Sequence, residues 1–474
     1  MTARPGLVLS LLFATLAHAN LITTENARPG TDRWRLRTAP SDQINGYASA
    51  TSIAAGETIR FYVSTPDPTF DLEIFRTGWY GGLGGRRMTE AVTLRGGAQP
   101  VPAPDADGLI RCQWSESYSL VVPGDWVSGV YLAKLTGKPS GNQNYIIFTV
   151  RDNRAADLIF QNSVTTWQAY NNWGGKSLYP HNSTGPQAKK VSFDRPYSAE
   201  DGAGDYLFRW EYDMTRFLER EGYDVTYITN IDTHANPATL LRAKAFLSVG
   251  HDEYWTWEMR ANVEAARDRG IDLGFFSGNV CYWQARLEDD NRTLVSYKES
   301  ALATDPLATD GNPLNDNRVT TLWRNVPVMR PEESLLGVMY VESPVDGDIT
   351  VTNTSHWVFA NTGLRDGDRL KGLLGYEVDA IQGLQSPPNL VRLAHSPFVT
   401  TDGKDSGYSD MSIYTAPSGA LVFAVGSIQW SWGLDDFGPS VRGDRTSEAA
   451  RQITRNVLNR MIGMMPKRRS ARSF

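Results

Sequence analysis

The first third of the chain shows short apolar segments in which hydrophobic and polar positions alternate with a period of two. Five of them lie at 58–63, 70–75, 118–122, 130–135 and 145–150. They are rich in β-branched and aromatic residues and are separated by turns that contain glycine, proline or aspartate. Segments of this length and spacing predict that residues 20–152 form an antiparallel β-sandwich of the immunoglobulin-like kind.

After residue 152 the pattern changes to strands that alternate with helices. Strands are predicted at 156–161, 225–229, 245–249, 273–277 and 420–425, and helices at 206–221, 257–269 and 447–461. The stretch from 285 to 415 is less regular and contains several strands. Alternating strands and helices indicate parallel βαβ units with right-handed crossovers. We therefore expect residues 153–463 to form a three-layer α/β domain.

The two ends of the chain carry a different kind of signal. Residues 1–19 combine Arg4, a short apolar stretch and the ending Ala17-His18-Ala19, which is typical of a signal peptide. The apolar stretch is shorter than the roughly 20 residues that a membrane span needs. The sequence thus predicts an exported protein, periplasmic or secreted, with no membrane span. Residues 464–474 are expected to be a solvated basic tail.

Composition narrows the classes of partner. The formal net charge is −6, 41% of the residues are hydrophobic and 21% are charged, which is the balance of a globular protein with more than one core. The basic residues are scattered, so the sequence gives no sign of a nucleic-acid partner. In an oxidising compartment Cys112 and Cys281 could form a disulfide, but they could equally be two buried thiols.

Polar and aromatic segments follow three of the predicted parallel strands. The strand at 245–249 leads to the segment His251-Asp252-Glu253-Tyr254, and the strand at 273–277 leads to Asn279. The strand at 156–161 leads to an aromatic cluster that consists of Trp167, Tyr170, Trp173 and Tyr179. Ligands bind outside the carboxyl ends of the strands in open α/β sheets. If these strands are neighbours, the three segments meet in one cleft.

His251 and Glu253 are two residues apart, so in an extended chain both side chains point to the same side and Asp252 points away. Histidine suits proton transfer near neutral pH, and a carboxylate suits metal binding or base catalysis. The alternative is that Asp252 or a neighbour only caps the helix predicted at 257–269. The Gly-x-Ser-x-Gly and His-Glu-x-x-His signatures of other hydrolases do not occur.

Five segments, in matching order, resemble the family of N,N-dimethylformamidase large (beta) subunits. They are YNNWGG (170–175), SVGHDEYW (248–255), FFSGNVCYW (275–283), GYEVD (375–379) and VFAVGSIQWSWGLD (422–435). Two further segments, SGVYLAKL (128–135) and YIIFTVRD (145–152), resemble the β-sandwich segment that precedes the α/β domain in this family. We expect the α/β domain to resemble the glutamine-amidotransferase-like (flavodoxin-like) fold.

The resemblance implies a hydrolase of small formamide-like amides that holds one ferric iron between two tyrosinates and one glutamate. These metal ligands fall on Tyr131, Tyr170 and Glu253. The family's catalytic histidine, substrate-contacting asparagine and candidate base fall on His251, Asn279 and Glu377. Tyr414 matches an aromatic residue of the substrate-binding wall, where the family carries phenylalanine. An oligomer is possible, and the sequence does not identify a small partner subunit.

The residue types fit this chemistry without the family name, because phenolate and carboxylate oxygens are hard donors that favour a Lewis-acidic ion. A second hypothesis stays open. With 14 Trp and 20 Tyr, an aromatic cleft could bind a carbohydrate or cell-surface ligand without any chemistry. Our main prediction is an exported, iron-dependent amidohydrolase of linear amides or related C–N bonds.

Overall fold

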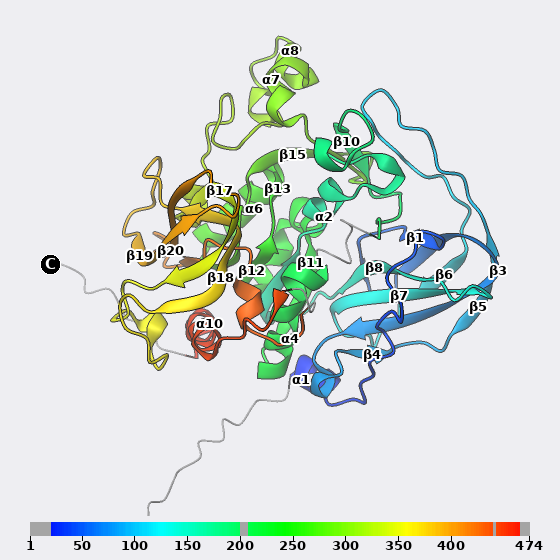
Figure 1. Ribbon diagram of the computed structural model, residues 1–474, viewed down its shortest axis with the longest axis horizontal. Coiled ribbons are helices and arrows are strands. Elements are labelled where there is room, and N and C mark those ends of the chain that lie inside the picture. Colours follow the sequence, from blue (N-terminus) through cyan, green and yellow to red (C-terminus); the bar gives the residue numbers. More distant parts are fainter. Residues whose placement is uncertain (1–19, 200–206, 439–441, 465–474) are drawn as a thin grey trace, which may run out of the picture.

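The computed structural model describes residues 20–199, 207–438 and 442–464. The predicted signal peptide and all but the first residue of the predicted basic tail lie outside these residues. Strands dominate the N-terminal part, whereas strands and helices alternate after it, which makes this a mixed α/β protein (Figure 1). We call residues 45–151 the β region and residues 156–461 the α/β region.

The β region is an eight-stranded sheet with the order β1-β3-β7-β8-β2, in which β4, β5 and β6 also pair with β3. The strands are β1 (Asn45–Ala48), β2 (Ser52–Ala54), β3 (Thr58–Thr77), β4 (Gly85–Arg87), β5 (Val92–Gly97), β6 (Tyr118–Val121), β7 (Gly129–Lys138) and β8 (Gln143–Arg151). The pairs are antiparallel except for β2 and β8, which are parallel. A short helix, α1 (Leu21–Asn26), precedes them.

The strand β3 joins two segments that the sequence pattern separates. We expected strands at 58–63 and 70–75, because Pro66 and Pro68 suggest a turn between them. The structure has one strand of 20 residues, and its register against β5 shifts between Thr65 and Thr69. An irregularity of this kind tolerates residues that cannot donate a ladder hydrogen bond. The chain therefore stays extended through both prolines.

The α/β region is built on a seven-stranded sheet with the order β11-β9-β12-β14-β21-β20-β19. The strands are β9 (Ala156–Asn162), β11 (Val225–Thr229), β12 (Ala243–His251), β14 (Asp272–Gly278), β19 (Val391–Val399), β20 (Ser406–Thr415) and β21 (Leu421–Ala424). The first five in spatial order are parallel, and β20 and β19 are antiparallel. Five parallel strands are what the alternating pattern predicts.

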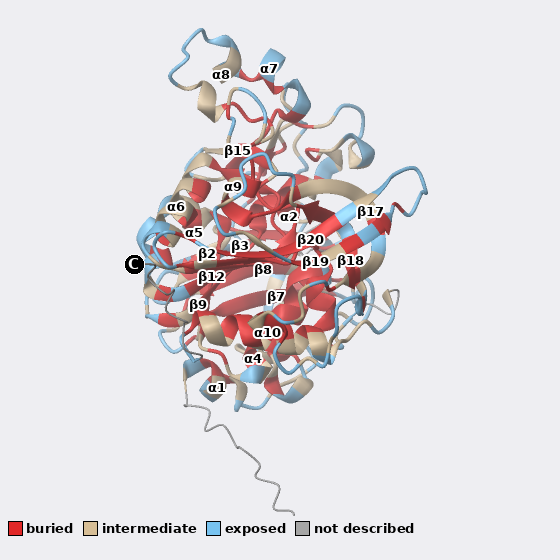
Figure 2. Ribbon diagram, turned by 90° about the vertical axis from the view of Figure 1, so that its left-hand side faces the viewer, coloured by how far each residue is buried: buried red, intermediate tan, exposed pale blue. Residues whose placement is uncertain are grey.

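Helices pack against both faces of this sheet. The main ones are α2 (Val164–Tyr170), α4 (Tyr212–Glu221), α5 (Asn230–Ala235), α6 (Trp257–Asp268) and α10 (Glu448–Met461). Alternate residues of each strand enter different cores: Leu247 and Val249 pack with α4 and α10, whereas Phe246 packs with α6. The period of two along the strands thus produces a helix–sheet–helix arrangement. Figure 2 shows the central strands as buried.

The irregular region carries two smaller sheets and several short helices. The sheet β10-β16-β15-β13 consists of β10 (Lys190–Ser192), β13 (Tyr254–Thr256), β15 (Trp283–Glu288) and β16 (Thr293–Val295). The second sheet pairs β17 (Met339–Thr350) with β18 (Arg369–Ala380). The helices α7 (Ala301–Thr304) and α8 (Pro306–Thr309) project from the body of the molecule, and α9 (Glu333–Leu336) follows (Figure 1).

The β region packs against α4 and β11 of the α/β region. Arg76, at the end of β3, is fully buried and its Nη2 lies 2.8 Å from Oε1 of Glu219 on α4. The hydroxyl of Ser128 accepts a hydrogen bond of 2.9 Å from the backbone N–H of Tyr227 on β11. A buried ion pair and a buried hydroxyl bridge at one boundary fix the two regions against each other.

The cysteines are two separate buried thiols. Cys112 and Cys281 are both free, and they belong to different core clusters. Burial raises the pKa of the Cys112 thiol to about 12, so this group stays protonated at neutral pH. Within the described residues, every helix is too short or too polar to cross a lipid bilayer.

Glu211 is a buried carboxyl group that holds the end of β9 and the start of α2. It precedes α4 in a short π-helix, η4 (Leu207–Glu211), and accepts hydrogen bonds from Asn162 Nδ2 (2.7 Å), the Ser163 N–H (3.2 Å) and Trp167 Nε1 (2.8 Å). Burial raises the pKa of Glu211 to about 8, against 4.5 for an ordinary glutamate. The folded protein thus keeps a proton that the unfolded chain releases.

This proton makes stability depend on pH. The contribution of Glu211 is present in full below about pH 4.5 and is lost as the pH rises towards about 8, because the unfolded chain binds fewer protons in that window. We expect the unfolding free energy of the unchanged protein to fall by a few kcal/mol, to order of magnitude, as the pH rises through this window. In Glu211→Gln this fall should be absent, because glutamine does not titrate. Urea denaturation of the unchanged protein and of the Glu211→Gln variant at pH 5 and pH 8 measures this difference in unfolding free energy. Equal losses in both proteins would contradict the assignment.

Candidate active site

Neighbouring strand ends bring the polar segments together. The strands β9, β12 and β14 are adjacent, and His251 at the end of β12 is level with Gly278 at the end of β14. Asn279 follows β14 directly, and Tyr170 ends the helix that follows β9. Glu377 comes from β18, where Val378 forms a bridge to Ser427 after β21. Because parallel strands share one carboxyl edge, the first three side chains meet there, and the bridge from Val378 to Ser427 brings Glu377 to the same edge.

The carboxylate of Glu253 is the centre of this group. It accepts hydrogen bonds from the Tyr170 hydroxyl (2.9 Å) and from the Tyr179 hydroxyl (2.8 Å to Oε1 and 2.9 Å to Oε2). The two tyrosine rings stack with their centroids 4.2 Å apart. The Lys298 ammonium lies 3.4 Å from the centroid of the Tyr179 ring. Two phenol oxygens and a carboxylate therefore converge at one buried point next to a buried cation.

His251 lies between two carboxylates. Its Nε2 is 3.0 Å from Oε2 of Glu377 and 3.4 Å from Oε2 of Glu253. Burial favours the neutral imidazole, but the charges of Glu377 and Glu253 outweigh it and raise the pKa of His251 to about 9. Burial acts to raise the pKa of Glu377, but the positive charge of His251 and the hydrogen bonds hold it below its usual value. At neutral pH the site thus holds an imidazolium beside an ionised Glu377.

Asn279 is held in a strained conformation with one polar atom unused. Its backbone has φ = 49°, in the left-handed region, and its N–H donates to Asp379 Oδ1 (2.8 Å). The side-chain Nδ2 donates to Glu377 Oε2 (2.6 Å), whereas Oδ1 is buried and has no hydrogen-bond partner among the described residues. Strain and an unpaired buried acceptor are features of ligand sites.

Asp252 points away from this group, as the extended-chain argument requires. Its carboxylate accepts hydrogen bonds from Gln161 (2.7 Å), Asn230 (3.0 Å) and Ser248 (2.9 Å). The cap of α6 is Thr256, whose hydroxyl accepts from the Met259 N–H. The helix is therefore capped three residues after the charged turn. Capping does not explain why His251 and Glu253 are buried together.

Tyr131 is not brought to the site. On β7 the side chains of Val130 and Leu132 pack towards the α/β region, and the side chains of Tyr131 and Ala133 pack inside the β region. The Tyr131 ring stacks on Trp126 at 4.9 Å and its hydroxyl donates to the Val127 carbonyl (2.6 Å). The alternation along the strand thus turns this phenol away from Glu253. The structure corrects the expectation that Tyr131 crosses into the cleft.

Tyr414 is also remote from the group around Glu253. It lies on β20 in the core that contains α6, on the other face of the sheet. Its hydroxyl donates to the Leu335 carbonyl (2.6 Å) and is 3.3 Å from Nη1 of Arg267. The structure thus does not bring Tyr414 to the group around Glu253, where we expected it to form part of a substrate-binding wall.

Two residues of the site carry a role that the sequence did not assign. Tyr179 was part of the aromatic cluster, where aromatic residues more often form core or pocket wall than a ligand. Lys298 is 3% exposed and donates to the Leu178 carbonyl (3.2 Å). Burial lowers the pKa of Lys298 to about 8. The sequence signal that could have identified Lys298 is its position shortly after the apolar residues Leu294 and Val295 and directly after Tyr297, because a lysine in a buried segment is rare unless it is paired.

The donor set at Glu253 fits a hard metal ion. Two phenol oxygens and a carboxylate suit a hard cation such as ferric iron, and the nearby unpaired Asn279 Oδ1 can accept a hydrogen bond from a bound ligand. No group of three or more His, Cys, Asp and Glu side chains suited to a metal occurs in the part of the chain that the structure describes. The donor set therefore includes the two tyrosine oxygens beside Glu253.

Two comparisons with known proteins bear on the family of this chain. A family described as N,N-dimethylformamidase beta subunit-like, C-terminal, matches residues 71–445. The N,N-dimethylformamidase beta subunit of Alcaligenes sp is 22% identical over 439 residues, which cover 75% of this chain and 55% of that protein. The chain thus spans about half the length of this relative.

Proposed function

The chain belongs to the N,N-dimethylformamidase beta subunit-like family, a family of hydrolases, and from this premise we propose that it hydrolyses a C–N amide bond at Glu253. The observation that carries the proposal is the convergence of Tyr170 and Tyr179 on Glu253, next to the His251–Glu377 pair. The family favours hydrolysis over the non-catalytic ligand-binding alternative.

We propose that Tyr170, Tyr179 and Glu253 would hold one iron ion. Bound there, such an ion supplies Lewis acidity for the amide carbonyl and for water. Asn279 Oδ1 is placed to accept a hydrogen bond from the substrate or from water. Glu377, held ionised by His251, is placed to take a proton from water. His251 carries the proton that a leaving amine needs.

Iron bound to tyrosinate absorbs visible light, and this provides the test. We expect purified protein to contain about one iron per chain and to be coloured, because its two phenol donors adjoin one carboxylate. Tyr179→Phe should weaken the band and lower the iron content. Tyr131→Phe should change neither, because the Tyr131 hydroxyl is bonded to a backbone carbonyl in the β region. Elemental analysis and absorption spectra measure both.

The outcomes separate two hypotheses. Loss of the band in Tyr131→Phe, with Tyr179→Phe unchanged, would restore the ligand set that the family resemblance implied. A protein that stays colourless and free of iron after reconstitution would contradict the metal proposal itself.

Four further properties remain our proposals. We propose that the protein is exported, on the pattern of residues 1–19, and that it assembles with other subunits, since its relative is named as a beta subunit. We also propose that the β region is immunoglobulin-like and that the α/β region is flavodoxin-like. The helix–sheet–helix layers and the five parallel strands support the flavodoxin-like assignment of the α/β region.

A further inference from the structure

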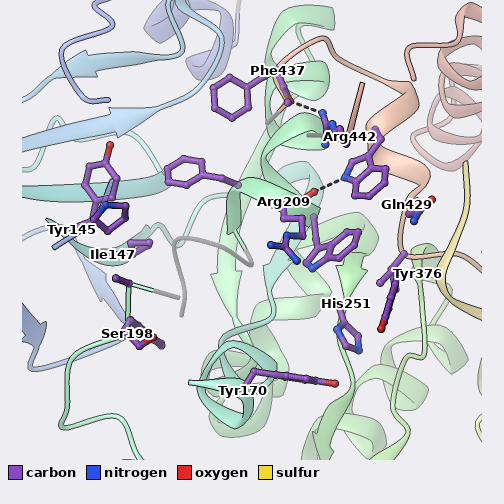
Figure 3. Close-up of a pocket in the computed structure, with 18 of the residues that line it drawn as sticks. Tyr145, Ile147, Tyr170, Ser198, Arg209, His251, Tyr376, Gln429, Phe437 and Arg442 are labelled. Carbon is purple, nitrogen blue, oxygen red and sulfur yellow. Dashed lines mark hydrogen bonds between the residues drawn. The ribbon is translucent and has the colours of Figure 1, made fainter. Parts of the chain in front are cut away.

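The site opens into a pocket far larger than a formamide requires. The pocket has a volume of about 1130 Å³ and reaches Tyr170, His251 and Glu377. Figure 3 shows Tyr170 and His251 at one end and Phe437 and Arg442 at the other. Drug-sized ligands occupy pockets of roughly 300–1,000 Å³. A substrate with only two N-methyl groups would leave most of this space to water.

Aromatic rings line the pocket away from the site. Trp210 and Trp432 stack with centroids 5.1 Å apart and planes at 10°, and Trp34 stacks on Phe208 at 5.5 Å. Phe437 lies 6.2 Å from Phe208. Flat apolar walls of this kind bind an apolar or aromatic group rather than a small polar one.

The pocket also carries an excess of positive charge. Four arginines and two carboxylates line it among the described residues: Arg35, Arg209, Arg442 and Arg445, against Asp346 and Glu377. One carboxylate, Glu377, is at the site, and the other, Asp346, is 2.6 Å from Arg445. The charge at the end near Phe437 therefore favours an anion.

Arg442 offers a specific anchor for that anion. Its side chain is only 6% exposed, and Nη2 donates to Asp213 (2.5 Å) and to the Phe437 carbonyl (2.5 Å). Its Nη1 is buried without a hydrogen-bond partner in the part of the chain that the structure describes. The Arg35 guanidinium lies 5.2 Å from the Phe437 ring on the exposed side. An unpaired guanidinium N–H and a second arginine suit a carboxylate.

From these observations, and resting on the proposed function, we propose that the substrate is an N-acylated amino acid with an apolar side chain. Asn279 and Glu253 are 3% and 2% exposed, so the acyl group that they meet must be small, such as formyl. The apolar side chain would lie on the Trp210–Trp432 wall, and the carboxylate would face Arg442 and Arg35. Water adds to the carbonyl carbon, the C–N bond breaks and the amine nitrogen takes a proton, which releases formate and the amino acid.

The test compares three amides in the iron-loaded protein. We expect kcat/KM for N-formylphenylalanine to exceed that for its uncharged C-terminal amide and for dimethylformamide by tenfold or more. Arg35→Gln should lower only the value for N-formylphenylalanine, several-fold and through KM, since Arg35 is exposed and lies beside Phe437, at the end of the pocket opposite His251. Arg33→Gln is the matched control, because Arg33 is bonded to Glu73 and does not line the pocket.

A second measurement needs no turnover. Trp34, Trp210 and Trp432 line the pocket, so N-formylphenylalanine should change the tryptophan fluorescence of metal-free protein, with weaker binding in Arg35→Gln. This inference would be overturned, and the proposed function left intact, if the protein hydrolysed dimethylformamide but neither bound N-formylphenylalanine nor hydrolysed it in preference. Arginine-dependent binding without hydrolysis of any amide would support the ligand class and overturn the proposed function.

Discussion

Replacing Glu377 with glutamine is expected to lower kcat/KM for amide hydrolysis by about 10²–10⁴-fold, the usual contribution of a general base. Oε2 of Glu377 lies 3.0 Å from His251 and 2.6 Å from Asn279. Burial acts to raise the pKa of Glu377, but these contacts outweigh it, so the carboxylate stays ionised and oriented. Glutamine has the same shape but cannot accept a proton. Steady-state kinetics measure the loss.

The control for this change is Glu342→Gln. Glu342 lies on the partner strand β17, level with Val378, and its Oε1 accepts a hydrogen bond from the Ser343 N–H in its own segment. We expect nearly full activity from this variant. If Glu377→Gln kept more than a tenth of the normal rate while still binding iron, the base would have to be another group.

Replacing Glu219 with glutamine is expected to lower the free energy of unfolding by about 3–5 kcal/mol, because it leaves a buried guanidinium without its countercharge. Arg76 and Glu219 both have fully buried side chains, and they meet through two hydrogen bonds of 3.0 and 2.8 Å. Equilibrium denaturation with urea, followed by tryptophan fluorescence, measures the change.

An exposed pair provides the comparison. Glu90 is 81% exposed and pairs with Arg87, so Glu90→Gln should cost less than about 1 kcal/mol. The double change Arg76→Met with Glu219→Leu should recover part of the loss, because it removes both charges together. A loss in Glu219→Gln no larger than in Glu90→Gln would show that water reaches the Arg76 guanidinium.

Periodicity located most strands well, because a buried strand between turn residues leaves a clear pattern. The segment 225–229 coincides with β11, and the helix expected at 257–269 ends one residue later than α6. The pattern failed where tertiary contacts decide the outcome. The prolines of β3 are tolerated by an irregular register, which depends on the partner strand and leaves no local signal.

The candidate site shows the same limit. Chain order sufficed to expect His251, Asn279 and Tyr170 together, because all three follow neighbouring parallel strands. A sequence motif does not show which way a side chain points. Side chains alternate along β7, and this alternation directs Tyr131 into the core of the β region rather than towards Glu253. Tyr179 lies in a loop, so its approach to Glu253 depends on the course of that loop rather than on any period.

The architecture changes near residue 152, but we do not expect a fragment that ends there to be stable as an independent unit. A fragment that ended there would keep the Arg76 guanidinium hydrogen-bonded to the carbonyls of Val127 and Ser128, but Glu219, the carboxylate that pairs with it, lies 143 residues downstream. During synthesis the Arg76 guanidinium has no contact with Glu219 until α4 has been translated. The two parts of the molecule therefore cannot be exchanged between relatives like independent modules unless α4 is exchanged as well.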